Sequence, residues 1–374
     1  MKSKKAKIIF IGCFLSYLII FFVGILFGED KKFSDLENRY LSSKPKFSLK
    51  SLVNREYGDK LEKYIADQFP LRDEFISIKA ISEYTIRKKE NNGVYLGKDG
   101  YLIEKFPSIK TEQVERNINY INSFADEYNT SFLLAPTSLE LYADKVPKYA
   151  QDLDEGYIID ELKKQFNESV RFVDVKEVLN NNRDKNLYYK TDHHWTTTGA
   201  YYAYCEFMET LGLSPLRLDD FSIEQVSDSF YGTLFSKGNF TFVKPDTIEM
   251  YRHKKDISVE VDYVDENKVT DTLYEYSYLD KKDKYGFFID NNHPLVKIKT
   301  GTETGKKIAI IKDSYAHSFV PFLIGHFDEI HMIDLRMYKQ SVKEYLDKEK
   351  INDVLFLYNI RNFVIDKDII RVTK

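Results

Sequence analysis

Residues 191–199 read Thr-Asp-His-His-Trp-Thr-Thr-Thr-Gly, which places two adjacent histidines, an acid and the only tryptophan of the chain within five positions. If this stretch is extended, Asp192 and His194 project to one face and His193 to the other, because side chains alternate along a strand. A carboxylate bonded to one imidazole nitrogen fixes the tautomer and leaves the other nitrogen to take a proton from a nucleophile. The spacing therefore predicts that His194 is a base oriented by Asp192.

Two other interpretations of this stretch are open. Thr196 or Thr197 can cap a helix that runs toward Leu211, in which case the acid and the histidine are structural. A catalytic zinc ion would need three protein ligands and an open position. The chain has no HExxH motif and no cysteine pair, and its other histidines show no ligand spacing. We therefore expect no metal at this site.

The composition limits the classes of function. With 374 residues, of which 43% are apolar, the chain can bury a sizeable core. A net charge of -4 and a pI near 6.1 give no basic surface for nucleic acid. The 28 tyrosines and 27 phenylalanines either fill the core or offer stacking platforms for sugars. There are two cysteines, and Cys13 lies in the apolar N-terminal run, so an intramolecular disulfide in the rest of the chain is excluded.

The N-terminus has the pattern of a membrane anchor. Residues 8–27 form twenty positions without a charge, enough to cross a hydrocarbon core of about 30 Å. Lysines precede this run, and Glu29 and Asp30 follow it. The positive-inside rule then keeps the N-terminus in the cytoplasm and exports everything after Gly28. Because no small-x-small cleavage site follows, we predict an uncleaved, single-pass anchor in the cell membrane rather than a signal peptide.

The rest of the chain divides by its pattern into a stalk and a larger domain. Residues 29–90 read as a helical, extracytoplasmic stalk that Pro70 interrupts. Residues 91–374 begin with a glycine-punctuated hairpin at 93–102 and continue with helices alternating with strands. The strands are expected at 131–135, 170–175, 307–311, 329–334 and 354–358. Such alternation predicts an α/β fold, with a mostly parallel sheet sandwiched by helices. The alternation stops at 221–300, which we interpret as a β-rich insertion.

A candidate nucleophile follows one of these strands. The buried run 308–311 leads into Lys312, Asp313, Ser314 and Tyr315. A serine at a turn from strand to helix exposes its hydroxyl beyond the sheet, and the N–H groups of that turn can point at an oxyanion. A helix N-cap is the alternative role for Ser314.

Together these motifs resemble the DHHW-motif proteins, relatives of the alginate O-acetyltransferase proteins in the SGNH/GDSL hydrolase superfamily. The resemblance extends from about Phe33 to the C-terminus. It implies a catalytic Asp192, His194 and Ser314, with the later Asp-Ser element supplying the nucleophile. In an ordinary SGNH fold the serine comes first. The reversed order here implies the circular permutation of the alginate branch.

The resemblance also suggests an oxyanion hole. Asn359 follows the last predicted strand, where the superfamily keeps its oxyanion asparagine, although it can equally be a strand cap. Tyr315 is the second oxyanion candidate, and Lys312 stands where the family has a glycine. Further candidate site residues are Asn292, His193 and Arg361.

The resemblance implies a membrane-anchored, extracytoplasmic O-acyltransferase that acetylates a cell-surface or exported polysaccharide through an acyl-serine, with no cofactor. It also implies a multi-spanning membrane-bound O-acyltransferase partner that supplies the acetyl group. Proteins of teichoic-acid D-alanylation resemble this chain in having an anchor and an exported SGNH-like domain, but the D-x-H-W pairing resembles the alginate branch more closely. An acetylesterase with the same triad is one alternative, since both reactions share the acyl-enzyme. A non-catalytic protein that binds glycan or organises a membrane complex is the other.

Overall fold

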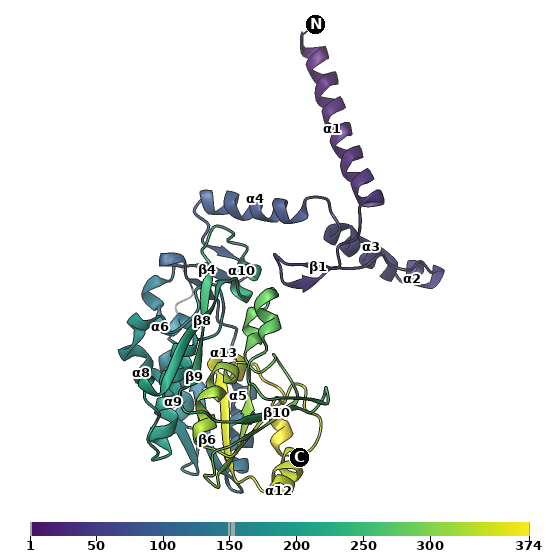
Figure 1. Ribbon diagram of the computed structural model, residues 1–374. Coiled ribbons are helices and arrows are strands. Elements are labelled where there is room, and N and C mark those ends of the chain that lie inside the picture. The colour runs from purple at the N-terminus through teal and green to yellow at the C-terminus, as the bar shows by residue number, and fades with distance from the viewer. Residues whose placement is uncertain (1, 149, 151–153, 374) are drawn as a thin grey trace. The chain divides into compact units, whose positions relative to one another are not determined.

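The computed structural model, drawn in Figure 1, describes residues 2–148, 150 and 154–373. The chain divides into two units. The smaller unit contains the residues up to Asn91 together with Asn239–Thr241, and the larger unit contains the rest. The motifs around His194 and Ser314 both lie in the larger unit.

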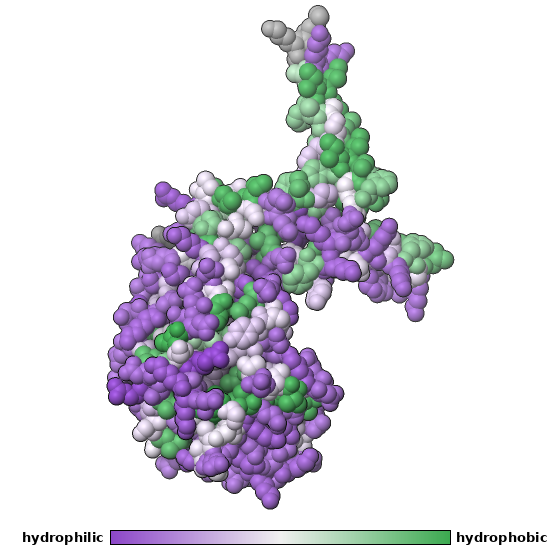
Figure 2. Space-filling view, in the orientation of Figure 1, coloured by the Kyte–Doolittle hydropathy of each residue, from purple (hydrophilic) through white to green (hydrophobic). Residues whose placement is uncertain are grey.

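The smaller unit consists of helices and short strands. Its elements are α1 (Lys2–Phe27), β1 (Phe33–Ser34), β2 (Arg39–Tyr40), α2 (Leu49–Val53), α3 (Glu56–Asp67), α4 (Arg72–Thr85) and β3 (Glu90–Asn91). Residues Lys4–Phe27 are long and apolar enough to cross a membrane, by length and composition. Figure 2 shows hydrophobic surface along this helix. The gap between α3 and α4 lies at Pro70, where the sequence predicts a break.

An ion pair connects two segments of this unit. Arg39 donates from its two terminal nitrogens to both carboxylate oxygens of Asp67, at 2.5 and 3.1 Å. The N–H of Ser42 donates to the same buried carboxylate at 2.8 Å. These hydrogen bonds, those of Arg39 first, hold the pKa of Asp67 well below its usual range. The segment around β2 is therefore bound to the end of α3 by charge-assisted bonds.

The larger unit is built on an eight-stranded sheet in the order β11-β10-β12-β14-β13-β15-β6-β7. Its strands are β6 (Asn129–Ala135), β7 (Val170–Val173), β10 (Val259–Tyr263), β11 (Lys268–Thr270), β12 (Leu295–Thr300), β13 (Lys307–Lys312), β14 (Glu329–Ile333) and β15 (Asp353–Asn359). The five strands predicted from the alternation pair in parallel, whereas β12, β10 and β11 are antiparallel to their neighbours. The α/β class is confirmed, and the sheet is mixed.

The region at 221–300 is rich in strands, as predicted, but only part of it is separate from the sheet. β8 (Phe221–Phe230) and β9 (Asp246–His253) form an antiparallel hairpin of their own. β10, β11 and β12 extend the main sheet beyond β14. The end of the helix–strand alternation is therefore not a structural boundary, because antiparallel neighbours need no crossover helix.

Helices cover the sheet. They are α5 (Thr111–Ala125), α6 (Ser138–Leu141), α7 (Glu155–Lys163), α8 (Lys176–Asn181), α9 (Thr197–Thr210), α10 (Thr233–Gly238), α11 (Ala316–Phe319), α12 (Val342–Glu349) and α13 (Ile360–Phe363). α9 packs against α8 and α11, while α5 and α12 both contact the 3-10 turn η8 (Ile369–Thr373). Figure 1 shows α8 and α9 on one side of the strands and α12 on the other. The hairpin predicted at 93–102 is β4 (Val94–Leu96) with β5 (Leu102–Glu104).

The register of the central strands brings three loops together. Lys312, the last residue of β13, lies opposite Leu357 of β15. Asn359, the last residue of β15, lies opposite Ala135, the last residue of β6. The segments that follow these strands therefore leave the sheet at the same edge, where reactive groups collect in parallel α/β proteins.

A glycine at the start of α9 fixes how closely that helix approaches the chain before it. A Cβ on Gly199 would lie 2.3 Å from the carbonyl oxygen of Leu187 and 3.0 Å from Cβ of Trp195. We predict that Gly199→Ala destabilises the larger unit by about 1–3 kcal/mol, because overpacking against backbone outweighs the gain of about 1 kcal/mol in helix propensity. Chemical denaturation measures this change.

The matched control is Gly58→Ala. Gly58 is also the third residue of its helix, α3, and a Cβ there meets no atom within 4 Å. This variant should be neutral or slightly stabilising. A Gly199→Ala protein as stable as the parent would mean that the approach of α9 to Leu187 is looser than described.

Candidate active site

Ser314 lies in the turn between β13 and α11, and the carboxylate of Asp313 organises this turn. One oxygen of Asp313 accepts the N–H of Tyr315 at 2.9 Å. The other oxygen accepts three bonds, from the N–H of Asn359 at 2.9 Å, its side-chain amide at 2.7 Å, and the amide of Asn362 at 2.9 Å. The buried acid thus joins the end of β13 to the end of β15 and holds the half-buried serine at the edge of the sheet.

Asp192, His194 and Ser314 form one hydrogen-bonded chain. Nδ1 of His194 lies 2.5 Å from Oδ1 of Asp192, and Nε2 lies 2.7 Å from Oγ of Ser314. With an ionised Asp192, Nδ1 donates, so Nε2 is the acceptor for the serine hydroxyl. Asp192 and His194 are 2% and 5% exposed. The arrangement has the geometry of a nucleophile, a base and an orienting acid.

The local backbone differs from the extended segment that the sequence analysis assumed. Residues 190–194 are bends, closed by an isolated antiparallel bridge between Tyr188 and Trp195. The N–H of His194 donates to Oδ1 of Asp192 at 3.0 Å, so the carboxylate folds the backbone back on itself. His193 consequently does not point away. Its Nδ1 lies 3.6 Å from the same oxygen, and its ring lies 3.9 Å from that of His194.

The region at 221–300 supplies a group that the sequence analysis did not single out for the site. The N–H of Thr233, the first residue of α10, donates to Oδ2 of Asp192 at 2.7 Å. Gly232 lies directly against this acid, since a Cβ there would lie 2.3 Å from both Cβ and Oδ2 of Asp192. The glycine is therefore required, because a larger side chain would overlap the carboxylate; the sequence shows the glycine but not which acid packs against it.

The same region also supplies Tyr285. Its ring stacks on the imidazole of His194, with centroids 3.8 Å apart and planes within 9°. Its hydroxyl donates to the carbonyl of Ser314 at 3.2 Å and bonds the hydroxyl of Ser318 at 3.1 Å. Tyr285 thus contacts both the base and the nucleophile turn, and it fixes the plane of the imidazole.

Trp195 connects the two motifs directly. Its indole N–H donates to the carbonyl of Tyr315 at 3.0 Å and to the hydroxyl of Ser318 at 3.1 Å. In return, the hydroxyl of Tyr315 donates to the carbonyl of His193 at 2.5 Å. The side chains of Trp195, Tyr315 and Ser318 are fully buried. These reciprocal bonds set the distance between the base and the serine.

Burial and the neighbouring charges set the ionisation of the pair. Burial alone raises the pKa of Asp192, but the two imidazoles and the N–H of Thr233 hold it well below its usual range. Burial lowers the pKa of His194, the charge of His193 also lowers it, and Asp192 opposes both effects, so that the resulting pKa is about 4. At neutral pH the site therefore contains a carboxylate and a neutral imidazole, which is the form that can accept a proton.

The two oxyanion candidates have different environments. The N–H of Tyr315 already donates to Asp313, so it could serve an oxyanion only by giving up this bond. Asn359 caps α13 through its side-chain oxygen, and one amide hydrogen binds Asp313, which leaves one hydrogen. The N–H of Ser314 has no bond to a protein acceptor within the described residues.

The remaining candidates lie in different places. A cleft beside Ser314, here the serine cleft, is lined by Glu104, Thr137, Ser138, His193, Leu234, Tyr315, Asn359, Arg361 and Asn362. Within it Arg361 pairs with Glu104 at 3.1 Å, and Lys237 pairs with the same acid at 2.6 Å. Asn292 is exposed and accepts a hydrogen bond from Arg336, so the structure does not bring it into this cleft.

Lys312, which occupies the position of the family's glycine, is a buried lysine behind the nucleophile. Its Nζ lies 2.6 Å from Nε2 of His317 and 3.5 Å from Oδ2 of Asp334. Burial lowers the pKa of Lys312 to about 8 and the pKa of His317 well below its ordinary value. A neutral His317 can accept a hydrogen bond from the ammonium at Nε2, which puts its own proton on Nδ1, a buried atom with no hydrogen-bond partner among the described residues.

The two histidines and Asp192 could also ligate a metal by geometry, since their ligand atoms lie within 4.8 Å of one another. Both oxygens of Asp192 are already acceptors, for His194 and Thr233. Both nitrogens of His194 are likewise engaged, by Asp192 and Ser314. Metal binding would replace these bonds, so the arrangement fits a base better than a ligand set.

The sequence profile of the DHHW protein family matches residues 96–333, and the chain belongs to this family. A DHHW family protein from Eubacterium siraeum has a similar structure, with a TM-score of 0.64 at 23% identity, over 76% of this chain and 96% of that one. Bacillus cereus PatB1, solved with a sulfonyl adduct, is similar with a TM-score of 0.64 at 21% identity, over 75% and 98%. The O-acetyltransferase domain of Pseudomonas putida AlgJ matches at a TM-score of 0.46 and 15% identity, over 74% and 94%. No curated protein matches the sequence.

The contact between Gly232 and Asp192 gives a structural prediction. Gly232→Ala should displace the carboxylate of Asp192 and lengthen its bond to His194, because the added Cβ would overlap it. A short, charge-assisted N–H···O bond places the imidazole proton far downfield in a proton spectrum. In the variant we expect this resonance to move upfield or disappear. Proton NMR of protein with nitrogen-15-labelled histidine measures it.

Gly58→Ala should leave that resonance unchanged, because Gly58 has no atom near its Cβ position. If Gly232→Ala also leaves it unchanged in a folded protein, Asp192 is not held against this glycine.

Proposed function

We propose that this protein is a membrane-anchored, extracytoplasmic O-acyltransferase that transfers an acetyl group to a polysaccharide through an acyl-serine intermediate. The observation that carries the proposal is the hydrogen-bonded chain from Asp192 through His194 to Ser314, with 2.7 Å between the base and the hydroxyl. Membership of the DHHW family supports it. So does the apolar helix Lys4–Phe27, which is long enough for an anchor.

In the first half-reaction, Nε2 of His194 takes the hydroxyl proton while Oγ of Ser314 attacks the acetyl carbonyl of the donor. The resulting imidazolium is stabilised by the carboxylate of Asp192, 2.5 Å from Nδ1. His194 then returns the proton to the leaving group, and the acetyl group remains on the serine. The N–H of Ser314 and the free amide hydrogen of Asn359 are the donors available for the oxyanion.

In the second half-reaction, a sugar hydroxyl replaces the leaving group. His194 deprotonates that hydroxyl, whose oxygen attacks the acetyl carbonyl, and the serine leaves with the proton that His194 returns. The serine cleft has Tyr315, His193 and Asn359 in its walls and a volume of about 20 Å³, so it would admit the acceptor hydroxyl while the rest of the sugar stays outside. An exported domain has no access to cytoplasmic acetyl donors. We therefore propose that a multi-spanning membrane-bound O-acyltransferase supplies the acetyl group.

The order of the motifs supports a permuted SGNH-like arrangement. The base precedes the serine by 120 residues in the chain, and the acid lies two residues before the base. Ser314 nevertheless follows β13, which lies between β14 and β15 inside the sheet. An ordinary SGNH fold would place its serine after the first strand, so a circular permutation accounts for the order.

An acetylesterase is the second candidate, since water can replace the sugar in the same mechanism. It is favoured by the half-buried position of Ser314, which gives water access to the acyl-enzyme. The reactions differ in the acceptor only. The ratio of acetylated glycan to free acetate therefore distinguishes them.

We predict that Ser314→Ala, His194→Ala and Asp192→Ala each lower the cleavage of 4-nitrophenyl acetate by on the order of 10⁴-fold, because each removes one member of a catalytic unit. The serine and histidine variants combined should lose no more than either one alone. A sulfonyl fluoride should label the parent protein and not Ser314→Ala. Steady-state rates and the mass of the intact protein measure these outcomes.

The matched control is Ser222→Ala, which removes an exposed hydroxyl on β8. It should cleave and be labelled like the parent, and a strong chelator should not change its rate or that of the parent. Labelling of a folded Ser314→Ala protein, or a rate lost to the chelator and restored by zinc, would rule out the proposed mechanism.

The pKa of His194 predicts the pH dependence of acylation. The neutral imidazole is the active form, so the rate falls as the pH drops through the pKa of His194. That pKa is about 4, whereas an unperturbed histidine would titrate near 6.5. We therefore expect kcat/KM for the ester to stay level from pH 7 down to about 5 and to fall below that value.

His193→Gln should move this fall to higher pH, because His193 is one of the groups that lower the pKa of His194. His253→Gln, outside the site, should leave the profile unchanged. A fall centred near pH 6.5 in the parent would mean that His194 is better solvated than its burial implies.

A further inference from the structure

Two further clefts share lining residues with the serine cleft or with each other along one segment of the chain. A middle cleft shares Asn362 with the serine cleft, and Lys312, Asp313 and Arg336 also line it. A third cleft shares Ile365 and Lys367 with the middle one. We call the third the basic cleft. Residues of the short segment from Tyr358 to Asp368 therefore line all three clefts.

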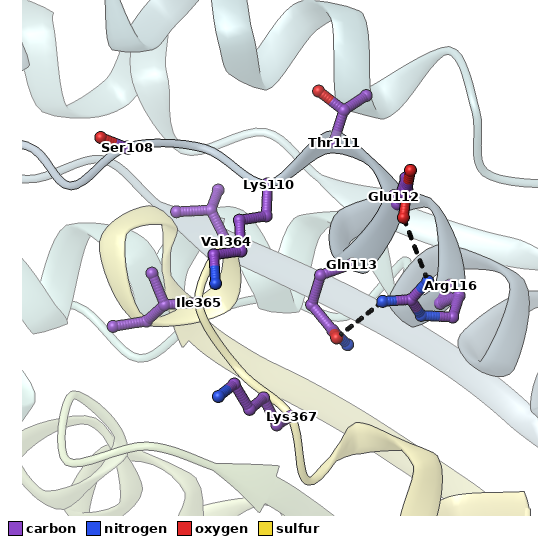
Figure 3. A pocket seen from close by; sticks show the side chains of 9 residues that line it. All are labelled: Ser108, Lys110, Thr111, Glu112, Gln113, Arg116, Val364, Ile365 and Lys367. Atoms are coloured by element: carbon purple, nitrogen blue, oxygen red, sulfur yellow. Dashed lines mark hydrogen bonds and ion pairs between the residues drawn. The ribbon is translucent and has the colours of Figure 1, made fainter.

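The basic cleft is drawn in Figure 3. Its lining residues are Ser108, Lys110, Thr111, Glu112, Gln113, Arg116, Val364, Ile365 and Lys367. Lys110 reaches from the chain before α5 toward Ile365, and Lys367 lies on the facing segment. Ile365 is 45% exposed, so it adds apolar surface to the cleft beside Lys110. Apolar and hydrogen-bonding surface together suit the two faces of a sugar ring.

The charges of the three clefts differ. In the middle cleft, Asp313, Asp366 and Asp368 balance the cationic groups. In the basic cleft the only acid is Glu112, whose side chain is 90% exposed and lies 3.8 Å from Arg116. Neither Lys110 nor Lys367 has an ion pair with any residue in the described part of the chain. The positive excess therefore lies in the basic cleft, which shares no lining residue with the serine cleft.

We propose that the basic cleft binds an anionic group of the acceptor polysaccharide while another sugar of the same chain presents its hydroxyl to Ser314. The inference rests on the proposed function and adds the acceptor class, a polymer that bears carboxylate or phosphodiester groups. Lys110 and Lys367 are the binding residues, and Ile365 packs against the sugar between them. Because one short segment of the chain lines all three clefts, a polymer rather than a single sugar fits as the occupant.

The charge of the cleft also predicts how binding responds to salt. Lys110 and Lys367 are exposed, so their attraction for an anion is screened as ionic strength rises. A neutral glycan would show no such dependence. Salt therefore separates recognition of charge from recognition of sugar rings.

The test measures polymer binding without turnover, using the full chain in detergent with Ser314→Ala in every sample. Calorimetric titration uses a polyuronate, a polyol phosphate polymer and neutral dextran. We expect the affinity for one or both anionic polymers to exceed that for dextran and to fall with salt. Lys110→Gln and Lys367→Gln should each weaken anionic binding about fivefold, the upper end for an exposed charge contact.

The matched control is the pair Lys254→Gln and Lys255→Gln, two exposed lysines after β9 that line none of these clefts. It should bind all three polymers like the parent. Equal binding of dextran and the charged polymers, or equal losses in the control and the cleft variants, would overturn the inference. The preference between polyuronate and polyol phosphate identifies the source of the anion.

The proposed function is tested separately in the same preparation. With Ser314 restored, the Lys110→Gln and Lys367→Gln proteins should cleave 4-nitrophenyl acetate at the parental rate, because neither residue lies at the reacting atoms. A parent protein without ester cleavage would contradict the acyl-serine mechanism. Retained cleavage with unaltered polymer binding would contradict only the basic cleft.

Discussion

The indole N–H of Trp195, donated to the carbonyl of Tyr315, is the bond on which the site depends. It joins two loops that are 120 residues apart and places the base next to the serine. Because the indole is fully buried, neither group can exchange this bond for one to water without a large desolvation cost. The return bond from the hydroxyl of Tyr315 prevents one loop from rotating about the other. The short distance from His194 to Ser314 is thus a consequence of core structure.

The local features of the chain could be predicted from the sequence. The helix cap at Thr196, the break at Pro70 and the strand that leads into Ser314 all follow from signals within a few residues. Asp192, His194 and Ser314 were also identifiable. The motif pairs the acid with the histidine, and the serine stands at the turn that follows a predicted strand. The alternation of helices and strands predicted the parallel strands, because two parallel neighbours need a crossover connection, usually a helix, which has its own periodicity in the sequence.

What could not be predicted depends on contacts between distant segments. The bond from Thr233 to Asp192 spans 41 residues, and nothing around Gly232 indicates which side chain will fill the space next to it. The stacking of Tyr285 on His194 is hidden among many aromatic residues, because a ring that fills the core and a ring that orients a base look alike in sequence. The direction of His193 was missed because the carboxylate of Asp192 bonds the backbone and turns an extended segment into a bend. In each case a non-local or side-chain bond overrides the local pattern.

The place of β15 in the sheet has a consequence for how the protein is made. This strand is the last in the sequence, yet it lies between β13 and β6 in the middle of the sheet. β6 pairs with it across more than 220 residues, so the sheet cannot close until the ribosome has passed Asn359. Contacts of such sequence separation form slowly and leave strand edges open in the meantime. During synthesis the nascent chain therefore lacks the hydrogen-bonded arrangement of Asp192, His194 and Ser314, which forms only with the completed sheet.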